Sequence, residues 1–90
     1  MSRFVVEGEL TIYRAADLRE TLLRALGEPG DLALDLSQVT EMDAAGLQLV
    51  LLARREAAAA GRSLRLAGLS AAVEEVFGLC GLAWAMEAGA

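Results

Sequence analysis

Residues 39–61 have the sequence VTEMDAAGLQLVLLARREAAAAG, which contains the longest helical pattern of the chain and its least ordinary turn. Asp43 stands before two alanines and Gly46, and an almost uninterrupted apolar run follows. Aspartate caps a helix well, because its side-chain oxygen accepts bonds from the free amides of the first turn and its charge suits the positive end of the helix dipole. The pattern therefore predicts a strand-to-helix turn at Asp43, with Gly61 ending the helix.

The two sides of this helix are expected to differ in role. On a helical wheel Leu52 borders an arc assigned to the core. The arc comprises Leu49, Val50, Ala53, Ala57 and Ala60. Leu47 and Leu51 point to the other side with Arg54 and Arg55, which predicts an apolar patch fringed by positive charge. Such a patch commonly marks a partner-binding surface, although a neighbouring helix that covers the leucines is the alternative.

Length and charge limit the possible organisation and partners. Ninety residues make one small domain, predicted to span residues 1–90, and the 56% of hydrophobic residues suffice for a two-layer core. The formal net charge of −5 argues against a nucleic-acid-binding surface, which needs a concentrated basic stripe.

The absence of histidine and the single cysteine exclude several kinds of site. Zinc sites, histidine-based acid–base catalysis and an intramolecular disulfide are not expected, and neither is any cofactor. A reducing, cytoplasmic setting fits this composition. The N-terminus lacks the pattern of a signal peptide, and the longest uncharged apolar stretch, residues 44–53, is too short to span a bilayer. We therefore expect a soluble protein without membrane insertion.

The chain before the organising helix begins with strand patterns. Residues 4–6 and 9–12 favour strands, and the Glu7-Gly8 pair between them predicts a short hairpin. A helical pattern follows from about Arg14, and glycines and a proline in residues 27–30 end it. Residues 32–36 are nearly all apolar, as in a central strand, and a loop is predicted from there to the organising helix.

The chain after Gly61 repeats the alternation of strand and helix. Residues 63–67 alternate as a half-covered strand does, and Ser70 is predicted to cap a helix. Residues 82–86 are predicted to form a last short strand. The order implies an α/β fold with a mostly parallel sheet of four to five strands, an antiparallel N-terminal hairpin and about three to four helices.

The candidate catalytic residues are few. Asp35 and Asp43 are both expected at carboxyl ends of strands, where α/β folds place their sites, but no histidine, further carboxylate motif or phosphate-binding loop supports them. The sequence therefore predicts a protein that is not an enzyme. Cys80 is predicted to be a buried small hydrophobic residue, and Trp84 is assigned to the core in preference to an exposed edge strand.

Residues 35–82, DLSQVTEMDAAGLQLVLLARREAAAAGRSLRLAGLSAAVEEVFGLCGL, resemble the STAS domain. The resembled signature is a strand ending in Asp-Leu-Ser, a short loop, and Asp-Ser/Thr-x-Gly-Leu opening a helix. A later strand, a serine-capped helix and a terminal Gly-Leu complete it, and VEGEL near the N-terminus resembles the Gly-Glu-Leu turn of the family. The resemblance covers nearly the whole chain and implies a single STAS-like domain.

The resemblance also implies where a switch residue should stand. In the family, a serine or threonine that a partner kinase phosphorylates commonly follows the aspartate, and Ala44 occupies that position here. Alanine has no hydroxyl to phosphorylate, and Ala45 does not replace it. Thr11 is a second departure, because many phosphorylated members carry an acidic residue after Gly-Glu-Leu.

The function implied is that of a non-enzymatic interaction module of bacterial signalling, resembling an anti-sigma factor antagonist but constitutively unphosphorylated at Ala44. The implied partner is an anti-sigma factor of the serine-kinase type, a histidine-kinase-like component or an ABC ATPase. Alternatives are a displaced phosphoacceptor at Thr40 or Ser37, an accessory subunit of an ABC lipid-transport complex, and small-ligand or nucleotide binding at the strand ends. The predicted partner-binding residues are Asp43, Ala44, Ala45, Gly46, Leu47, Leu51 and Arg54.

Overall fold

The computed structural model describes residues 2–81, in which strands and helices alternate strictly. The elements are β1 (Ser2–Leu10), α1 (Ile12–Leu26), β2 (Leu32–Met42), α2 (Ala44–Ala59), β3 (Leu64–Leu69) and α3 (Ala71–Leu79). Among the described residues, no helix is long and apolar enough to cross a membrane.

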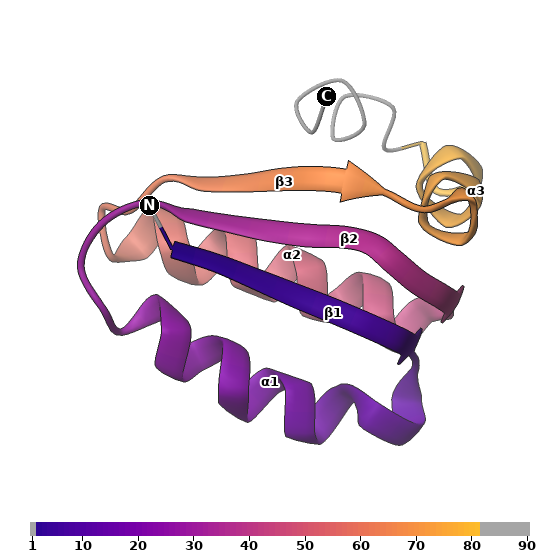
Figure 1. Cartoon of the computed structure of the whole chain (residues 1–90), viewed down its shortest axis with the longest axis horizontal. Coiled ribbons are helices and arrows are strands. Elements are labelled where there is room, and N and C mark those ends of the chain that lie inside the picture. Colours follow the sequence, from indigo (N-terminus) through magenta and orange to yellow (C-terminus); the bar gives the residue numbers. More distant parts are fainter. Residues whose placement is uncertain (1, 82–90) are drawn as a thin grey trace.

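The three strands form a parallel sheet in the order β1-β2-β3, with Phe4 beside Leu34 and Leu34 beside Leu66. Two successive right-handed crossovers in one direction place α1 and α2 on the same face of the sheet. Figure 1 shows both helices running along the strands, with α3 beyond the end of β3. The domain is therefore a sheet with one helical layer, closed at one end by α3.

The core lies between the sheet and this helical layer. The largest fully buried side chains come from β1, β2 and α3; they are Phe77, Leu10, Leu32, Leu34, Leu36 and Val73. The predicted core face of α2 is confirmed at Leu49, Val50, Ala53 and Ala57. Ala60 is exposed, because α2 ends one residue earlier, and Gly61 adopts the left-handed conformation that ends a helix.

The predicted antiparallel hairpin at the N-terminus is wrong. β1 is one strand of nine residues that pairs in parallel with β2 throughout. Gly8 has a φ of +78°, and the register shifts on both sides of it, so the Glu7-Gly8 pair forms an irregularity within the strand and does not reverse the chain. Arg14 supports this irregularity by donating hydrogen bonds to the carbonyl oxygens of Glu7 and Glu9, the latter at 2.8 Å.

The predicted sheet of four to five strands is likewise wrong for the described residues, which form three. The predicted loop at residues 37–42 is the second half of β2, because Val39 is buried and still paired with β1. The three helices agree with the prediction. The strand predicted at residues 82–86, with Trp84, lies outside the described residues.

The predicted burial of the single cysteine is also wrong. Cys80 is exposed, because α3 ends at Leu79 and Cys80 caps the helix without continuing its apolar face. Val73 and Phe77 form the buried face of α3.

Candidate functional site

The candidate site lies where β1 turns into α1 and β2 turns into α2. Leu10 and Met42, the last residues of these strands, are neighbours in the sheet. The first turns of α1 and α2 therefore begin side by side at one edge, the edge at which α/β sheets commonly bind their partners and ligands.

One carboxylate connects the beginnings of the two helices. Asp43 caps α2, and its Oδ1 accepts a hydrogen bond of 3.0 Å from the backbone N–H of Gly46. Its Oδ2 accepts a second, also of 3.0 Å, from the N–H of Ile12, the first residue of α1. Thr11, the cap residue of α1, makes no side-chain capping bond itself, so Asp43 supplies the cap for both helices.

The bonds to Asp43 keep it ionised. The N–H groups of Ile12 and then of Gly46 stabilise the carboxylate, which lowers the pKa of Asp43 below its usual value of 3.8. A carboxylate held in this form accepts hydrogen bonds and does not donate a proton at neutral pH. The side chain is committed to bonds within the chain, so its contribution to the site is to fix the turn.

Gly46 allows α2 to begin directly against the end of β1. A Cβ atom at this position would lie 2.0 Å from the carbonyl oxygen of Leu10 and 2.9 Å from its Cγ. Gly46 is buried, so the close approach of the two backbones is its role, and it offers no surface to a partner.

Asp35 and Asp43 are not brought together. Asp35 lies within β2, and eight residues of extended strand separate the two by about 25 Å. The prediction that Asp35 lies at a strand end is therefore wrong. Asp35 is buried, accepts a hydrogen bond of 2.8 Å from the N–H of Ser37 and pairs with Arg3. Among residues 2–81 there is no cluster of three His, Cys, Asp or Glu side chains suited to a metal ion.

The predicted placement of Leu47 outside the core is wrong. Leu47 is only 8% exposed and belongs to the core cluster, because the contact between Gly46 and Leu10 draws the first turn of α2 against β1. Leu51 is half-buried and packs against the core beside α1, whereas Arg54 is exposed. The apolar patch predicted from the helical wheel is thus covered at Leu47.

Two exposed hydrophobic residues that the sequence analysis did not identify lie at this turn. Ile12 is 67% exposed and Tyr13 is 86% exposed, both in the first turn of α1. The bond between Ile12 and Asp43 places them next to Ala44, which is also exposed. We call Ile12, Tyr13 and Ala44 the turn surface. The available signal is an Ile-Tyr pair between a strand and a polar helix, but the sequence pattern places Ile12 in the predicted hairpin strand.

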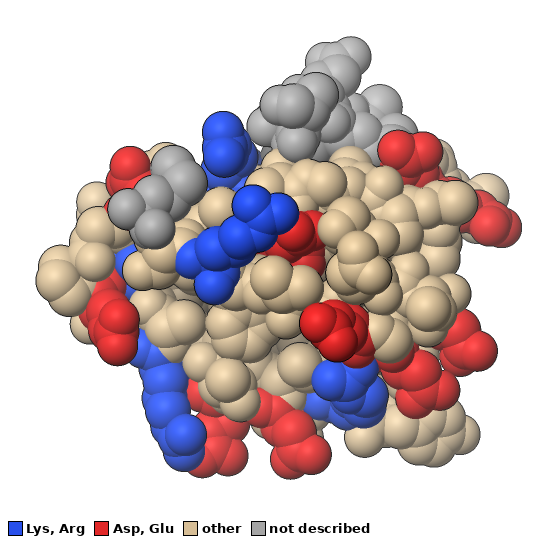
Figure 2. Space-filling model, viewed as in Figure 1, with Lys and Arg blue, Asp and Glu red and all other residues tan. Residues whose placement is uncertain are grey.

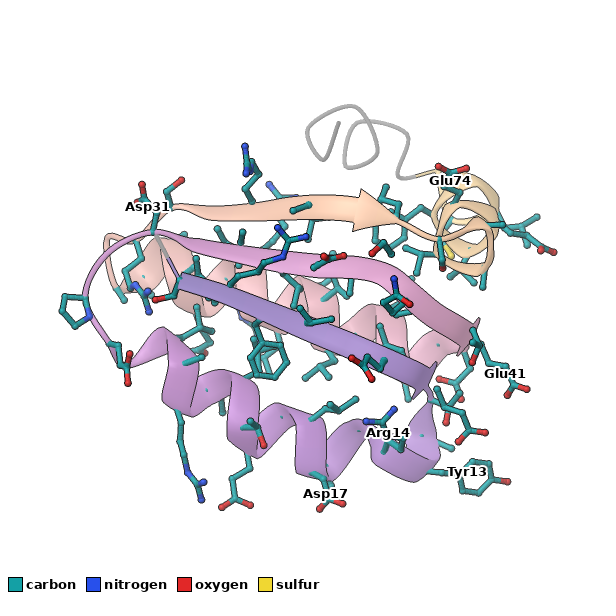
Figure 3. All side chains as sticks on the ribbon, in the orientation of Figure 1. Tyr13, Arg14, Asp17, Asp31, Glu41 and Glu74 are labelled. Carbon is teal, nitrogen blue, oxygen red and sulfur yellow. The ribbon has the colours of Figure 1, made fainter. Side chains whose placement is uncertain are left out.

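The surroundings of the turn surface are acidic. Figure 3 shows Tyr13 pointing away from the body of the molecule, with Glu41 at the same end. Figure 2 shows further acidic side chains at this end, with basic atoms among them, and Figure 3 labels Arg14 beside Tyr13. The turn surface is therefore an exposed apolar patch with negative charge around it.

Replacing Asp43 by alanine tests its double capping role. We expect Asp43→Ala to lower the free energy of unfolding by more than Ser70→Ala, which removes one capping bond from α3 and should cost about 1 kcal/mol. The reason is that Asp43→Ala frees amides in two helices at once. Urea unfolding of both variants at pH 7 measures the difference, and an equal or smaller loss in Asp43→Ala would contradict a shared cap.

Comparisons with known proteins agree with this architecture. The chain resembles the solved structure of the anti-sigma factor antagonist SpoIIAA in its unphosphorylated form, with 26% identity and a TM-score of 0.73 over 89% of this chain and 71% of that one. A sulfate transporter family protein from Wolinella succinogenes has the same fold at 20% identity, with a TM-score of 0.75 over 94% of this chain and 70% of that one.

A third structure, the STAS domain of a SulP transporter from Vibrio cholerae, shares the fold at 24% identity with a TM-score of 0.70. The match covers 92% of this chain but 65% of that domain. No curated protein sequence matches the chain. A family model described as "Mlab, STAS domain" matches residues 2–86. The chain, with its capped α2 and its parallel sheet, therefore belongs to the STAS family.

Proposed function

We propose that this STAS domain is a non-enzymatic protein-interaction module of bacterial signalling that binds its partner through the turn surface. The observation that carries the proposal is the exposure of Ile12 and Tyr13 beside Ala44. Large exposed apolar side chains on a rigid support are typical of binding hot spots, and Asp43 supplies that support by fixing both helix starts.

Ala44 makes the proposed surface constitutive. A phosphate at this position would add nearly two negative charges next to the ionised Asp43 and would disrupt an apolar contact. Alanine accepts no phosphate, so the surface stays in one state. Regulation then resides in the partner or in the amount of the protein.

The class of partner follows from the family resemblance. Similarity to an anti-sigma factor antagonist favours an anti-sigma factor of the serine-kinase type or a histidine-kinase-like component in the cytoplasm. An ABC ATPase is the alternative, and the protein would then be an accessory subunit of an ABC lipid-transport complex. Each of these partners would meet an apolar turn surface with acidic surroundings.

Charge at position 44 tests the proposal. We expect the wild type and Ala44→Ser to capture the same protein from the native cytoplasm, and Ala44→Glu to lose at least about nine-tenths of it, since a buried unpaired charge opposes binding strongly. Affinity capture followed by mass spectrometry measures this. Ala59→Glu is the matched control, because Ala59 is an exposed alanine at the opposite end of α2. Equal capture by all four proteins would overturn the turn surface as the docking site.

A displaced phosphoacceptor is the second candidate function, and the exposure of Thr40 on β2 is the observation that favours it. Ser37 is less suitable, because its N–H and hydroxyl both bond Asp35 and a phosphate there would face that carboxylate. Phosphate incorporation that disappears in Thr40→Ala would replace the constitutive surface by this alternative.

A further inference from the structure

A groove lies between α1 and α2 and continues away from the turn surface. Its volume is about 500 Å³, and Ala45, the neighbour of Ala44, lines its beginning. Figure 1 shows the two helices running along the same face of the sheet, so their outer sides form the walls. The lining residues include Ala15, Ala16, Leu51, Leu52, Arg19 and Arg55.

The floor of the groove is apolar. Leu51 and Leu52 are half-buried and pack against the core, yet both still line the groove. Ala15 and Ala16 on the opposite wall are too small to fill the space above them. Small residues beside leucines let a further helix approach to the usual interaxial distance of about 8–10 Å. The groove is open to solvent on one side, which suits a helix better than an acyl chain, since an acyl chain needs an enclosed cavity.

The charge of the groove is opposite to that of the chain. Arg19 stands on the α1 wall and Arg55 on the α2 wall, and both are exposed. Within residues 2–81 neither forms an ion pair, whereas Arg3 pairs with Asp35 and Arg24 with Glu20. The chain as a whole has a net charge of −5, yet two unpaired guanidinium groups face this groove. Such groups bind carboxylates strongly, so the groove is suited to a partner that carries acidic side chains.

We propose that this groove binds an amphipathic helix of the partner protein, with apolar side chains on Leu51 and Leu52 and carboxylates paired with Arg19 and Arg55. The inference rests on the proposed function, because the groove continues the turn surface at Ala45. Binding of an amphipathic helix in an apolar groove is a common mode of recognition, and the flanking charge pairs set its register.

Two synthetic peptides test the proposal. Each is an amphipathic helix of about 18 residues, or five turns, with leucines on one face; one carries two flanking glutamates and the other two lysines. Fluorescence anisotropy measures their binding to the wild type, to Arg19→Glu/Arg55→Glu and to Arg24→Glu. The last variant is the control, because Arg24 lies on α1 outside the groove. Circular dichroism confirms that all three proteins are folded.

We expect the wild type and the double variant to prefer opposite peptides. The glutamate peptide should bind the wild type and Arg24→Glu alike, and the double variant at least about tenfold more weakly, while the double variant should prefer the lysine peptide. Equal binding of the glutamate peptide to the wild type and the double variant, or no binding of either peptide, would overturn the proposal. So would arginine-dependent binding of anionic phospholipid vesicles, or of a second copy of the chain, without peptide binding.

The Ala44→Glu capture experiment separates this inference from the proposed function. If the peptides fail while Ala44→Glu still loses the captured partner, the groove proposal is overturned and the turn surface stands. If the peptides exchange preference while Ala44→Glu retains its partner, the groove is a binding site and the turn surface is not.

Discussion

Gly46→Ala is expected to lower the free energy of unfolding by about 3 kcal/mol, the upper end of the usual cost of overpacking. The added methyl would lie 2.0 Å from the carbonyl oxygen of Leu10, which is backbone and cannot rotate away. Either α2 must move off the end of β1 or β1 must bend, and both changes loosen the buried contacts of Leu47 and Leu10. In a domain of 90 residues this is a large fraction of the total stability.

Gly78→Ala is the matched control for this prediction. Gly78 lies within α3, and a Cβ atom there would have no neighbour within 4 Å. Alanine favours a helix over glycine by roughly 0.5–1 kcal/mol, so this variant should be more stable than the wild type. Urea unfolding at pH 7 compares the two variants. A Gly46→Ala protein as stable as the wild type would show that α2 does not depend on its contact with Leu10.

The beginning of α2 is the part of the fold that the sequence predicted best. An aspartate followed by two alanines, a glycine and an apolar run has a strong local cause, since capping acts between residues three positions apart. The bond from Asp43 to Ile12 could not be predicted in the same way. It joins residues 31 positions apart, and only the parallel pairing of β1 with β2 brings them together.

The errors share a different cause. Glu7-Gly8 has the composition of a tight turn, but its local preference does not distinguish a chain reversal from an irregularity inside a strand. Pairing with β2 decides whether the chain reverses at Glu7-Gly8 or continues as one strand. This pairing joins residues that are far apart in the sequence, so the local pattern does not reveal it. Leu47 was misplaced for a related reason: a helical wheel gives directions around one axis but not the close approach of β1 at Gly46.

The candidate site in the structure therefore comprises partly different residues from the site predicted from the sequence. Asp43 and Ala44 keep their predicted places at the turn, while Leu47 moves to the core and Ile12 and Tyr13 from another helix join the surface. The two proposed surfaces carry different charge, with acidic side chains around the turn surface and arginines along the groove. A partner that covers both surfaces would need basic groups against the turn surface and carboxylates along the groove. This charge pattern fixes the orientation in which the partner binds.

Asp35 is expected to make stability depend on pH in the acid range. Hydrogen bonds from the side chain and backbone of Ser37, together with the Arg3 guanidinium, lower the pKa of Asp35 from 3.8 to about 2. Because the folded pKa lies below the unfolded one, this stability is fully present above pH 3.8 and is lost as the pH falls through about 2. The shift corresponds to about 2 kcal/mol, at roughly 1.4 kcal/mol per unit.

Asp35→Asn removes the charge while nearly keeping the shape of the side chain. We expect it to lower the free energy of unfolding at pH 7 by about 2 kcal/mol and to flatten its fall between pH 4 and pH 2, with a remaining slope from Asp43, whose pKa is lowered as well. Asp17→Asn, on the exposed side of α1, is the control and should follow the wild type within about 0.5 kcal/mol. Unfolding curves in urea at several pH values measure both effects. If Asp35→Asn and the wild type lose stability in parallel on acidification, the carboxylate inside β2 contributes nothing through its charge, and its burial must be explained by the packing of the sheet alone.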